Sequence, residues 1–308
     1  MNNFWQNIKK PIIGLAPMDG ITDAAFRYII AKYGKPDVIY TEFYPVDGVI
    51  HKRAKDHFNF KRYEKNTKTV IQFFGSSPVN FYKAARLAQK LGYDGIDINM
   101  GCPDRTVMKK GGGAALISNS KLAQEIIEET KRGAGRLPVS VKTRIGEDKK
   151  LTEKWATILL ETNLDVISIH GRSLSQIFAG PVKWDELAMI AKLAEKTKTI
   201  ILGNGSVKSV TEVKEKCQKY GLGGILIGRA AFGNPWIFAD KVPTTKERFQ
   251  IMIEHCEKFL KFNPKGHFAS LRKHLAWYCK GFEGAAQMRE KLMHVNNLEE
   301  VRGIMSGF

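Results

Sequence analysis

The sequence predicts an α/β protein built as a (β/α)8 TIM barrel that is followed by a small C-terminal helical domain. Eight short apolar runs alternate with helical patterns up to about residue 238. Near-continuous runs of β-branched residues are typical of strands buried on both faces, as in parallel sheets. Their alternation with helices indicates βαβ units, and eight such units close into a barrel.

The predicted strands cover residues 12–16, 38–40, 69–73, 95–98, 139–141, 166–169, 200–202 and 224–227. The predicted helices between them cover residues 22–33, 78–91, 121–132, 152–162, 184–195 and 207–220. An open doubly wound sheet is the alternative, and it would need a glycine-rich fingerprint after the first strand. Residues 16–20, which read Ala-Pro-Met-Asp-Gly, do not supply one, so the barrel is favoured.

The alternation of strands and helices stops after Asn234-Pro235-Trp236. Beyond it, helical periodicity alone covers residues 249–262, 267–278, 284–295 and 298–305. We therefore divide the chain near Val242 into a barrel domain, residues 1–241, and a helical domain, residues 242–308. Residues 241–308 contain twelve Lys and Arg against seven Asp and Glu, a charge of +5. Such a tail either caps the barrel or holds a large anionic substrate.

The whole chain is strongly basic, with a net charge of +18 over 308 residues. This charge favours polyanionic partners such as nucleic acids, and a lysine-rich amino-acid usage is the plain alternative. No apolar run approaches the roughly 18 residues of a membrane span, and the first ten residues lack the apolar core of a signal peptide. We therefore expect a cytoplasmic protein that does not enter a membrane.

The four cysteines are scattered and form no C-x-x-C pair. This spacing argues against a disulfide framework, an iron–sulfur cluster and a zinc site, so we expect no metal. We expect Cys217, Cys256 and Cys279 to be buried, inert thiols. Cys102 differs, because it lies in Asn-Met-Gly-Cys-Pro at residues 99–103, a turn directly after a predicted strand.

Polar or glycine residues follow every predicted strand. In a barrel the carboxyl ends of the strands carry the loops that build the active site. These positions are Asp19, Glu42, Gln72, Asn99 with Cys102, Lys142 with Arg144, His170 with Arg172, residues 203–206 and residues 228–229. Their presence at all eight strand ends predicts one lined pocket.

Two glycine loops, at residues 203–206 and 228–230, follow the seventh and eighth strands. Barrels commonly bind phosphate at these two loops. Glycines let backbone N–H groups approach phosphate oxygens, and the helix N-termini that follow add positive potential. Arg229 adds a charge-assisted bond, so the two loops together predict a phosphate site.

Three further side chains suit a bound heterocycle. Lys142 interrupts an apolar strand, where it either stabilises negative charge on a reduced heterocycle or pairs with Glu42. His170 is either a core histidine or a ligand contact, and its position at a strand end favours the contact. Gln72 offers both a donor and an acceptor to a heterocycle edge.

Cys102 is open to two interpretations. A thiol with a pKa near 8.5 is mostly protonated at neutral pH, which suits general acid catalysis without activation. Covalent catalysis is the alternative, and it would need a base held against the sulfur. No histidine lies near Cys102 in the sequence, although His170 is a candidate in space.

With these residues in place, the chain resembles the tRNA-dihydrouridine synthases, which are FMN-dependent barrel reductases with a C-terminal helical tRNA-binding domain. The matching segments are residues 16–23, 72–75, 99–103, 141–144, 169–172, 203–205 and 227–230, in order along the barrel. The resemblance implies that NADPH reduces FMN, that hydride passes from flavin N5 to uracil C6, and that Cys102 protonates C5. It also implies tRNA as the partner, and we expect a monomer.

The resemblance further assigns the site residues. FMN would be contacted by Pro17, Met18, Asp19, Gln72, Lys142 and His170, and its phosphate by Asn204, Gly205, Ser206, Gly228 and Arg229. Cys102 would be the proton donor, with Asn99 and Arg144 at the uracil. The family's phosphate loop commonly reads Gly-Asn-Gly-Asp, whereas this chain has Ser206, whose hydroxyl we expect to cap the following helix.

Two other functions fit the sequence less well. A dihydroorotate-type FMN barrel acting on a small pyrimidine would need neither the +18 charge nor the basic tail. A non-catalytic RNA-binding protein on a decayed barrel would not need Cys102, Lys142 and His170 together. The use of NADPH rather than NADH rests on the resemblance alone, because no dinucleotide fingerprint is present.

Overall fold

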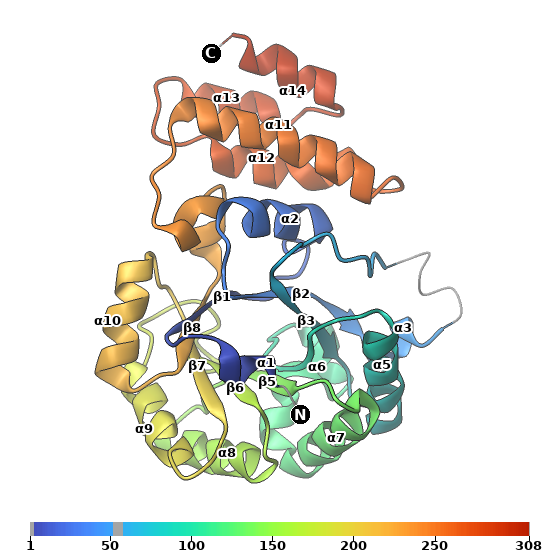
Figure 1. Cartoon of the computed structure of the whole chain (residues 1–308), viewed down its shortest axis with the longest axis vertical. Helices are drawn as coiled ribbons and strands as arrows, with labels where there is room; N and C mark the ends of the chain where they lie inside the picture. Colours follow the sequence, from blue (N-terminus) through green and yellow to red (C-terminus); the bar gives the residue numbers. More distant parts are fainter. Residues whose placement is uncertain (1–2, 52–57, 308) are drawn as a thin grey trace.

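A closed parallel barrel forms the larger part of the molecule (Figure 1). The computed structural model describes residues 3–51 and 58–307; residues 1–2, 52–57 and 308, which belong to the two predicted domains, lie outside the described residues. Each strand pairs in parallel with the next, and the first pairs with the eighth, for example Ile12 with Gly224. The predicted (β/α)8 barrel is confirmed.

The strands are β1 Ile12–Leu15, β2 Val38–Pro45, β3 Lys68–Phe74, β4 Gly95–Met100, β5 Val139–Arg144, β6 Val166–His170, β7 Ile200–Asn204 and β8 Gly224–Ile227. Every predicted strand coincides with one of them, but β2 and β5 run further than predicted. In β2 the register with β3 shifts between Tyr40 and Phe43. The polar residues Thr41 and Glu42 lie at this irregularity. The apolar pattern of the sequence therefore ends at Tyr40, although the strand continues to Pro45.

The barrel helices are α1 Phe4–Asn7, α2 Ala24–Tyr33, α3 Val46–Val49, α5 Pro78–Lys90, α6 Arg105–Lys109, α7 Ser120–Ala134, α8 Lys149–Glu161, α9 Trp184–Ala194 and α10 Val210–Tyr220, with 3-10 turns η1 Gly113–Ser118, η2 Arg229–Ala231 and η3 Pro235–Ala239. Helices α2 and α10 begin later than predicted because Asp23 and Ser209 are their N-caps. Helices α1, α3 and α6 were not predicted, since a single turn shows no periodicity.

The C-terminal region consists of α11 Thr245–Phe262, η4 Phe268–Leu271, α12 Arg272–Tyr278, α13 Ala285–Leu292 and α14 Leu298–Met305. Helix α11 begins before the predicted residue 249 because Thr244 and Glu247 form a capping box. The helix predicted over residues 267–278 is divided into η4 and α12. Among the described helices, none is long and apolar enough to cross a membrane.

Helix α2 belongs to the cores of both regions. Phe26 and Ile30 pack in the barrel core, whereas Ala24, Ala25 and Ile29 pack with the residues of α11 to α14. Figure 1 shows α2 between the barrel and the helical region. Because α2 directly follows the loop after β1, the helical region rests on an element that borders the predicted mouth.

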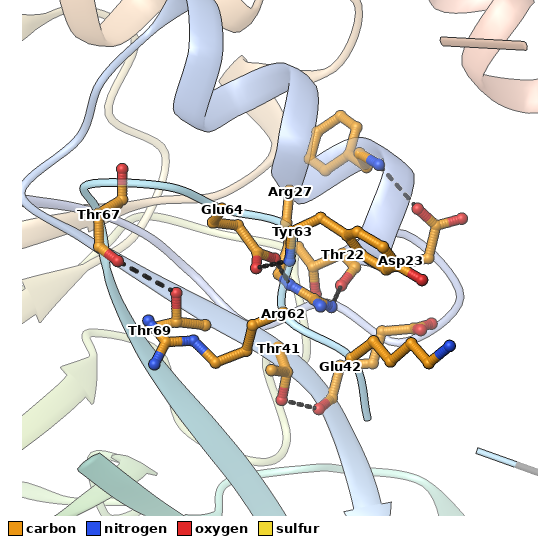
Figure 2. Close-up of polar contacts among 12 residues, drawn as sticks. Thr22, Asp23, Arg27, Thr41, Glu42, Arg62, Tyr63, Glu64, Thr67 and Thr69 are labelled. Carbon is orange, nitrogen blue, oxygen red and sulfur yellow. Dashed lines mark hydrogen bonds and ion pairs between the residues drawn. The ribbon is translucent and has the colours of Figure 1, made fainter. Parts of the chain in front are cut away.

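A buried ion pair fixes this shared helix (Figure 2). Arg27 of α2 bonds through Nε to Glu64, and both side chains are fully buried. Arg27 Nη1 also donates to the carbonyl oxygen of Thr22 at 2.8 Å, and the Tyr63 backbone N–H donates to Glu64 at 2.9 Å. Tyr63 in turn stacks on Phe262 of α11, with ring centroids 3.6 Å apart. The pair therefore joins the segment before β3, α2 and the helical region.

Replacing Glu64 with Gln should destabilise the protein by roughly 3–5 kcal/mol, because the Arg27 guanidinium then stays buried without its counter-charge. Thermal or urea unfolding of the purified protein measures the loss. The matched control is Glu129→Gln, which removes an exposed ion pair with Arg132 and should cost less than about 1 kcal/mol. Equal small losses in the two variants would contradict this role of the Arg27–Glu64 pair.

Candidate active site

Strand register brings the predicted side chains to one end of the barrel. Asn99 of β4 lies beside Lys142 of β5, Arg144 lies beside His170 of β6, and His170 lies beside Asn204 of β7. A Cβ built at Gly228, after β8, would lie 3.6 Å from the Met18 sulfur in the loop after β1. Sequence segments more than 200 residues apart therefore border a single mouth.

The Cys102 turn is held from two sides. The Asn99 side-chain oxygen accepts hydrogen bonds from the backbone N–H groups of Gly101 at 3.1 Å and Cys102 at 2.9 Å. On the other side, the Ala114 N–H donates to the Cys102 carbonyl oxygen at 3.0 Å. Gly113 has φ +59°, and a Cβ there would lie 2.7 Å from that oxygen, so the close approach requires glycine.

The Cys102 side chain is partly exposed, whereas Cys217, Cys256 and Cys279 are buried free thiols as predicted. Burial raises the pKa of the Cys102 thiol, and the charges of Asp104 and Asp19 add to the rise. The Asp104 backbone N–H and the charge of Arg144 oppose it. The net rise keeps the thiol protonated at neutral pH, which suits an acid better than a nucleophile.

Gln72 is buried beneath this turn. Its amide nitrogen donates to Asp97 at 2.6 Å, and its amide oxygen accepts from the Asn99 nitrogen at 2.9 Å. Both ends of the Gln72 amide therefore have partners within the protein, and so do both ends of the Asn99 amide. Asp97 also accepts a hydrogen bond from the Ser140 hydroxyl.

Lys142 lies in the mouth without an ion-pair partner among the described residues. Burial, together with the charge of Arg144, lowers the pKa of Lys142 to about 8, and the charge of Asp97 acts in the opposite direction. The alternative pairing with Glu42 is not formed. Glu42 is surrounded by Asp23, Arg27 and Asp19, and its burial raises its pKa to about 7.

His170 is bonded to an arginine, so its tautomer follows from the geometry. Arg172 Nη1 lies 3.3 Å from His170 Nε2, and because a guanidinium only donates, Nε2 accepts and Nδ1 carries the proton. Burial lowers the pKa of His170 to about 2, with further lowering by Lys142, Arg144, Arg172 and Arg229. Such an imidazole is a poor base, which argues against activation of Cys102 by His170.

The loop after β7 differs from the prediction at Ser206. Its hydroxyl accepts a hydrogen bond from Arg172 Nη2 at 2.9 Å, whereas Ser209 caps α10. Capping by Ser206 was therefore wrong, because the turn extends three residues further before the helix begins. Gly205 has φ +146°, and a Cβ there would lie 2.9 Å from a Val182 methyl carbon. The Asn204 amide donates to the Leu226 carbonyl at 2.8 Å and joins the ends of β7 and β8.

Four cations gather around this loop and His170: Lys142, Arg144, Arg172 and Arg229. None of them forms an ion pair with a described residue. After β8 the chain enters the short turn η2 rather than the α-helix that was predicted, and Arg229 is its first residue. Across residues 3–51 and 58–307, no group of three or more His, Cys, Asp or Glu could hold a metal ion. An uncompensated cationic cluster suits an anionic ligand.

Phe178 and Lys273, which border the mouth, were not predicted, and Arg172 was predicted at a strand end without a role. Arg172 joins His170 to Ser206, and its place in the Ile-His-Gly-Arg segment was the available signal. Phe178 is 57% exposed, with the guanidinium carbons of Arg144 and Arg229 at 5.5 and 5.6 Å from its ring centroid. Lys273 of α12 acts electrostatically on Asp19, and no pattern in the sequence indicated that contact.

The raised thiol pKa predicts the pH dependence of Cys102 alkylation. Because a raised pKa keeps the thiol protonated, the rate with iodoacetamide should still be increasing with pH above the ordinary thiol pKa of about 8.5. Mass spectrometry of the Cys102 peptide measures the rate, and the buried Cys217 and Cys256 serve as internal controls. A rate that reaches its plateau below that pH would show a thiolate activated at neutral pH and would contradict the prediction.

Comparison with known proteins shows which family the chain belongs to. A family model described as dihydrouridine synthase matches residues 14–306. A probable tRNA-dihydrouridine synthase of Staphylococcus aureus (strain COL) is 33% identical over 99% of this chain and 95% of its own length. A probable tRNA-dihydrouridine synthase 2 of Bacillus subtilis (strain 168) is 32% identical over 99% and 96%. A variant of NCR from Zymomonas mobilis shares the fold, with a TM-score of 0.52 and 17% identity over 72% of this chain and 83% of that one. The chain belongs to the dihydrouridine synthase family of enzymes.

Proposed function

We propose that this enzyme reduces specific uridines of tRNA to 5,6-dihydrouridine, with FMN as its bound cofactor and NADPH as the reductant. One observation carries the proposal: a thiol held protonated and a cluster of cations that form no ion pair with a described residue border the same mouth. The thiol suits proton donation, and the cations suit an anionic cofactor and an anionic substrate. The family and its curated relatives support the same reaction.

The residues at the mouth fit FMN. The loop at Gly205 packs so closely against Val182 that a Cβ there would lie 2.9 Å from a methyl carbon, which leaves its backbone free of a side chain. Arg172 bonds Ser206 of the same loop, and Arg229 acts electrostatically on Arg172. We propose that the phosphate binds there. The complete proposed set is Pro17, Met18, Asp19, Gln72, Lys142 and His170 for the flavin, and Asn204, Gly205, Ser206, Gly228 and Arg229, with Arg172 added, for the phosphate.

Reduced FMN, when bound, supplies the hydride for uracil C6. In this proposal Lys142 would provide positive charge beside the flavin, because its ammonium forms no ion pair with a described residue and Asp97 acts on it only electrostatically. His170 stays neutral and orients Arg172 through its ring nitrogen. These two side chains bind and orient, and neither needs to transfer a proton.

Cys102 donates the proton to uracil C5 in the proposed reaction. The thiol suits this step because its raised pKa keeps the proton on sulfur until the transition state requires it. Asn99 holds the turn, and Arg144 donates to the carbonyl oxygen of Gly101 at 2.8 Å. We propose Asn99 and Arg144 as the residues that border the uracil.

The helical region, residues 242–308, is the proposed tRNA-binding domain. It carries a charge of +5 over residues 241–308, and Lys273 of α12 acts on Asp19 and Asp23 beside the mouth. A tRNA held against this region would therefore lie next to the Cys102 turn. The base must leave its stack to reach the thiol, as in other enzymes that modify nucleobases.

Replacing Cys102 with Ala should abolish most tRNA turnover and leave the cofactor site intact. Loss of the general acid should lower the rate of dihydrouridine formation by roughly 10²–10⁴-fold. FMN should remain bound, and NADPH should still reduce it. Dihydrouridine is measured by mass spectrometry of digested tRNA, and flavin reduction by its absorbance.

Arg229→Ala is the matched control for this experiment. It should weaken FMN retention and leave the Cys102 alkylation rate unchanged, because Arg229 borders the proposed phosphate loop and not the turn. Unchanged tRNA turnover in Cys102→Ala would refute the proton-donor role. Turnover of free uracil alone by the unmodified enzyme would refute tRNA as the substrate.

A further inference from the structure

A buried chain of hydrogen bonds runs from the barrel interior to the Cys102 turn. Gln72 of β3 and Asp97 of β4 are partners in the strand register, and Gln72 donates to Asp97 at 2.6 Å. Asn99 donates to the Gln72 oxygen at 2.9 Å. The Asn99 oxygen then receives the N–H groups of Gly101 and Cys102. Two side chains, those of Gln72 and Asn99, therefore join the Asp97 carboxylate to the turn.

The donor-to-acceptor direction of these hydrogen bonds is fixed at both ends of the series. An ionised carboxylate only accepts hydrogen bonds, so the Gln72 amide must turn its nitrogen toward Asp97 and its oxygen toward Asn99. Backbone N–H groups only donate, so Asn99 must turn its oxygen toward Cys102 and its nitrogen toward Gln72. The two requirements agree, and neither amide can rotate by half a turn without placing two donors or two acceptors in contact.

Because these side chains are buried, a lost hydrogen bond would leave a polar atom without a partner. Asp97 and Gln72 are both 0% exposed, so water cannot replace a lost partner. Burial raises the pKa of Asp97 to about 6, while the bonds from Ser140 and Gln72 and the charge of Lys142 oppose the rise. The remaining charged or titratable neighbour is Tyr40, whose own pKa Asp97 raises further. At neutral pH the carboxylate is therefore mostly ionised and acts as an acceptor only.

We propose that Asp97 is a positioning residue, whose carboxylate orients the Gln72 and Asn99 amides and thereby sets the Cys102 turn. Asp97 itself does not touch the reacting atoms. The inference deepens the proposed function, because the turn carries the thiol that we propose as the proton donor. It also gives a reason for an acidic residue in the middle of the buried strand Gly95–Met100, whose other polar side chain is that of Asn99.

Exchanging the carboxylate of Asp97 with the amide of Asn99 tests the donor-to-acceptor direction of these hydrogen bonds. In Asn99→Asp, the new carboxylate still accepts from the turn but opposes the Gln72 oxygen, so the chain breaks. In Asp97→Asn, the new amide can turn its oxygen to Gln72 and keep the chain. In the double variant Asp97→Asn/Asn99→Asp, the Gln72 amide rotates and every donor again meets an acceptor, with the polarity reversed.

The readout is the pH profile of Cys102 alkylation in the purified full-length protein without tRNA, with iodoacetamide as the probe. Asn99→Asp should raise the rate at neutral pH severalfold, because release of the turn exposes the thiol to water and to the probe. Asp97→Asn and the double variant should return the profile of the unmodified protein. Ser140→Ala is the control, since Ser140 bonds Asp97 outside the path to Cys102.

A normal profile in Asn99→Asp, or an equal change in the single and double variants, would overturn the proposal. If Asn99→Asp does not fold, the double variant decides. A double variant that folds with a normal alkylation profile supports the proposed series of hydrogen bonds, and a double variant that also fails to fold contradicts it. The profile needs neither tRNA nor turnover. A result against the proposed reaction, which comes from the turnover assay, is therefore distinguishable from a result against the role of Asp97, which comes from the alkylation profile.

Discussion

The hydrogen bonds that link Asp97, Gln72 and Asn99 are the interaction on which the geometry of the mouth depends. They join β3 to β4 below the surface and end on the backbone N–H group of Cys102. The thiol is thereby held in a partly buried position, where burial raises its pKa. A turn without this support would expose the thiol to water and lose the property that suits it to proton donation.

The mouth also concentrates positive charge around His170. Lys142, Arg144, Arg172 and Arg229 all act on the neutral His170, and none of them forms an ion pair with a described carboxylate. Placing such cations together disfavours the folded protein unless an anion joins them, and perturbed clusters of this kind mark functional sites. The rigid support for this arrangement comes from the barrel and from α2, which the buried Arg27 pair holds in place.

Residue type and order along the chain predicted the barrel, the rim position of each candidate residue and the Cys102 turn. These features follow from local patterns: apolar runs, helical spacing and polar residues at strand ends. The partners of Gln72 and Ser206 could not be predicted, because they depend on strand register and on where a helix begins. Ser206 bonds Arg172, 34 residues away in the sequence, and Gln72 of β3 bonds Asn99 of the neighbouring strand β4. Contacts of that kind exist only once the barrel is closed.

The function proposed for this enzyme is the reduction of uridine within tRNA, with Cys102 as the proton donor and FMN, bound among the cations of the mouth, as the source of hydride. The most direct measurement is a map of dihydrouridine in tRNA from cells that lack this chain, compared with cells that have it. In cells that lack the chain, dihydrouridine should disappear at one or more defined positions. The unmodified chain should restore it, whereas the Cys102→Ala chain should not. An identical dihydrouridine pattern in the two strains would contradict the claim.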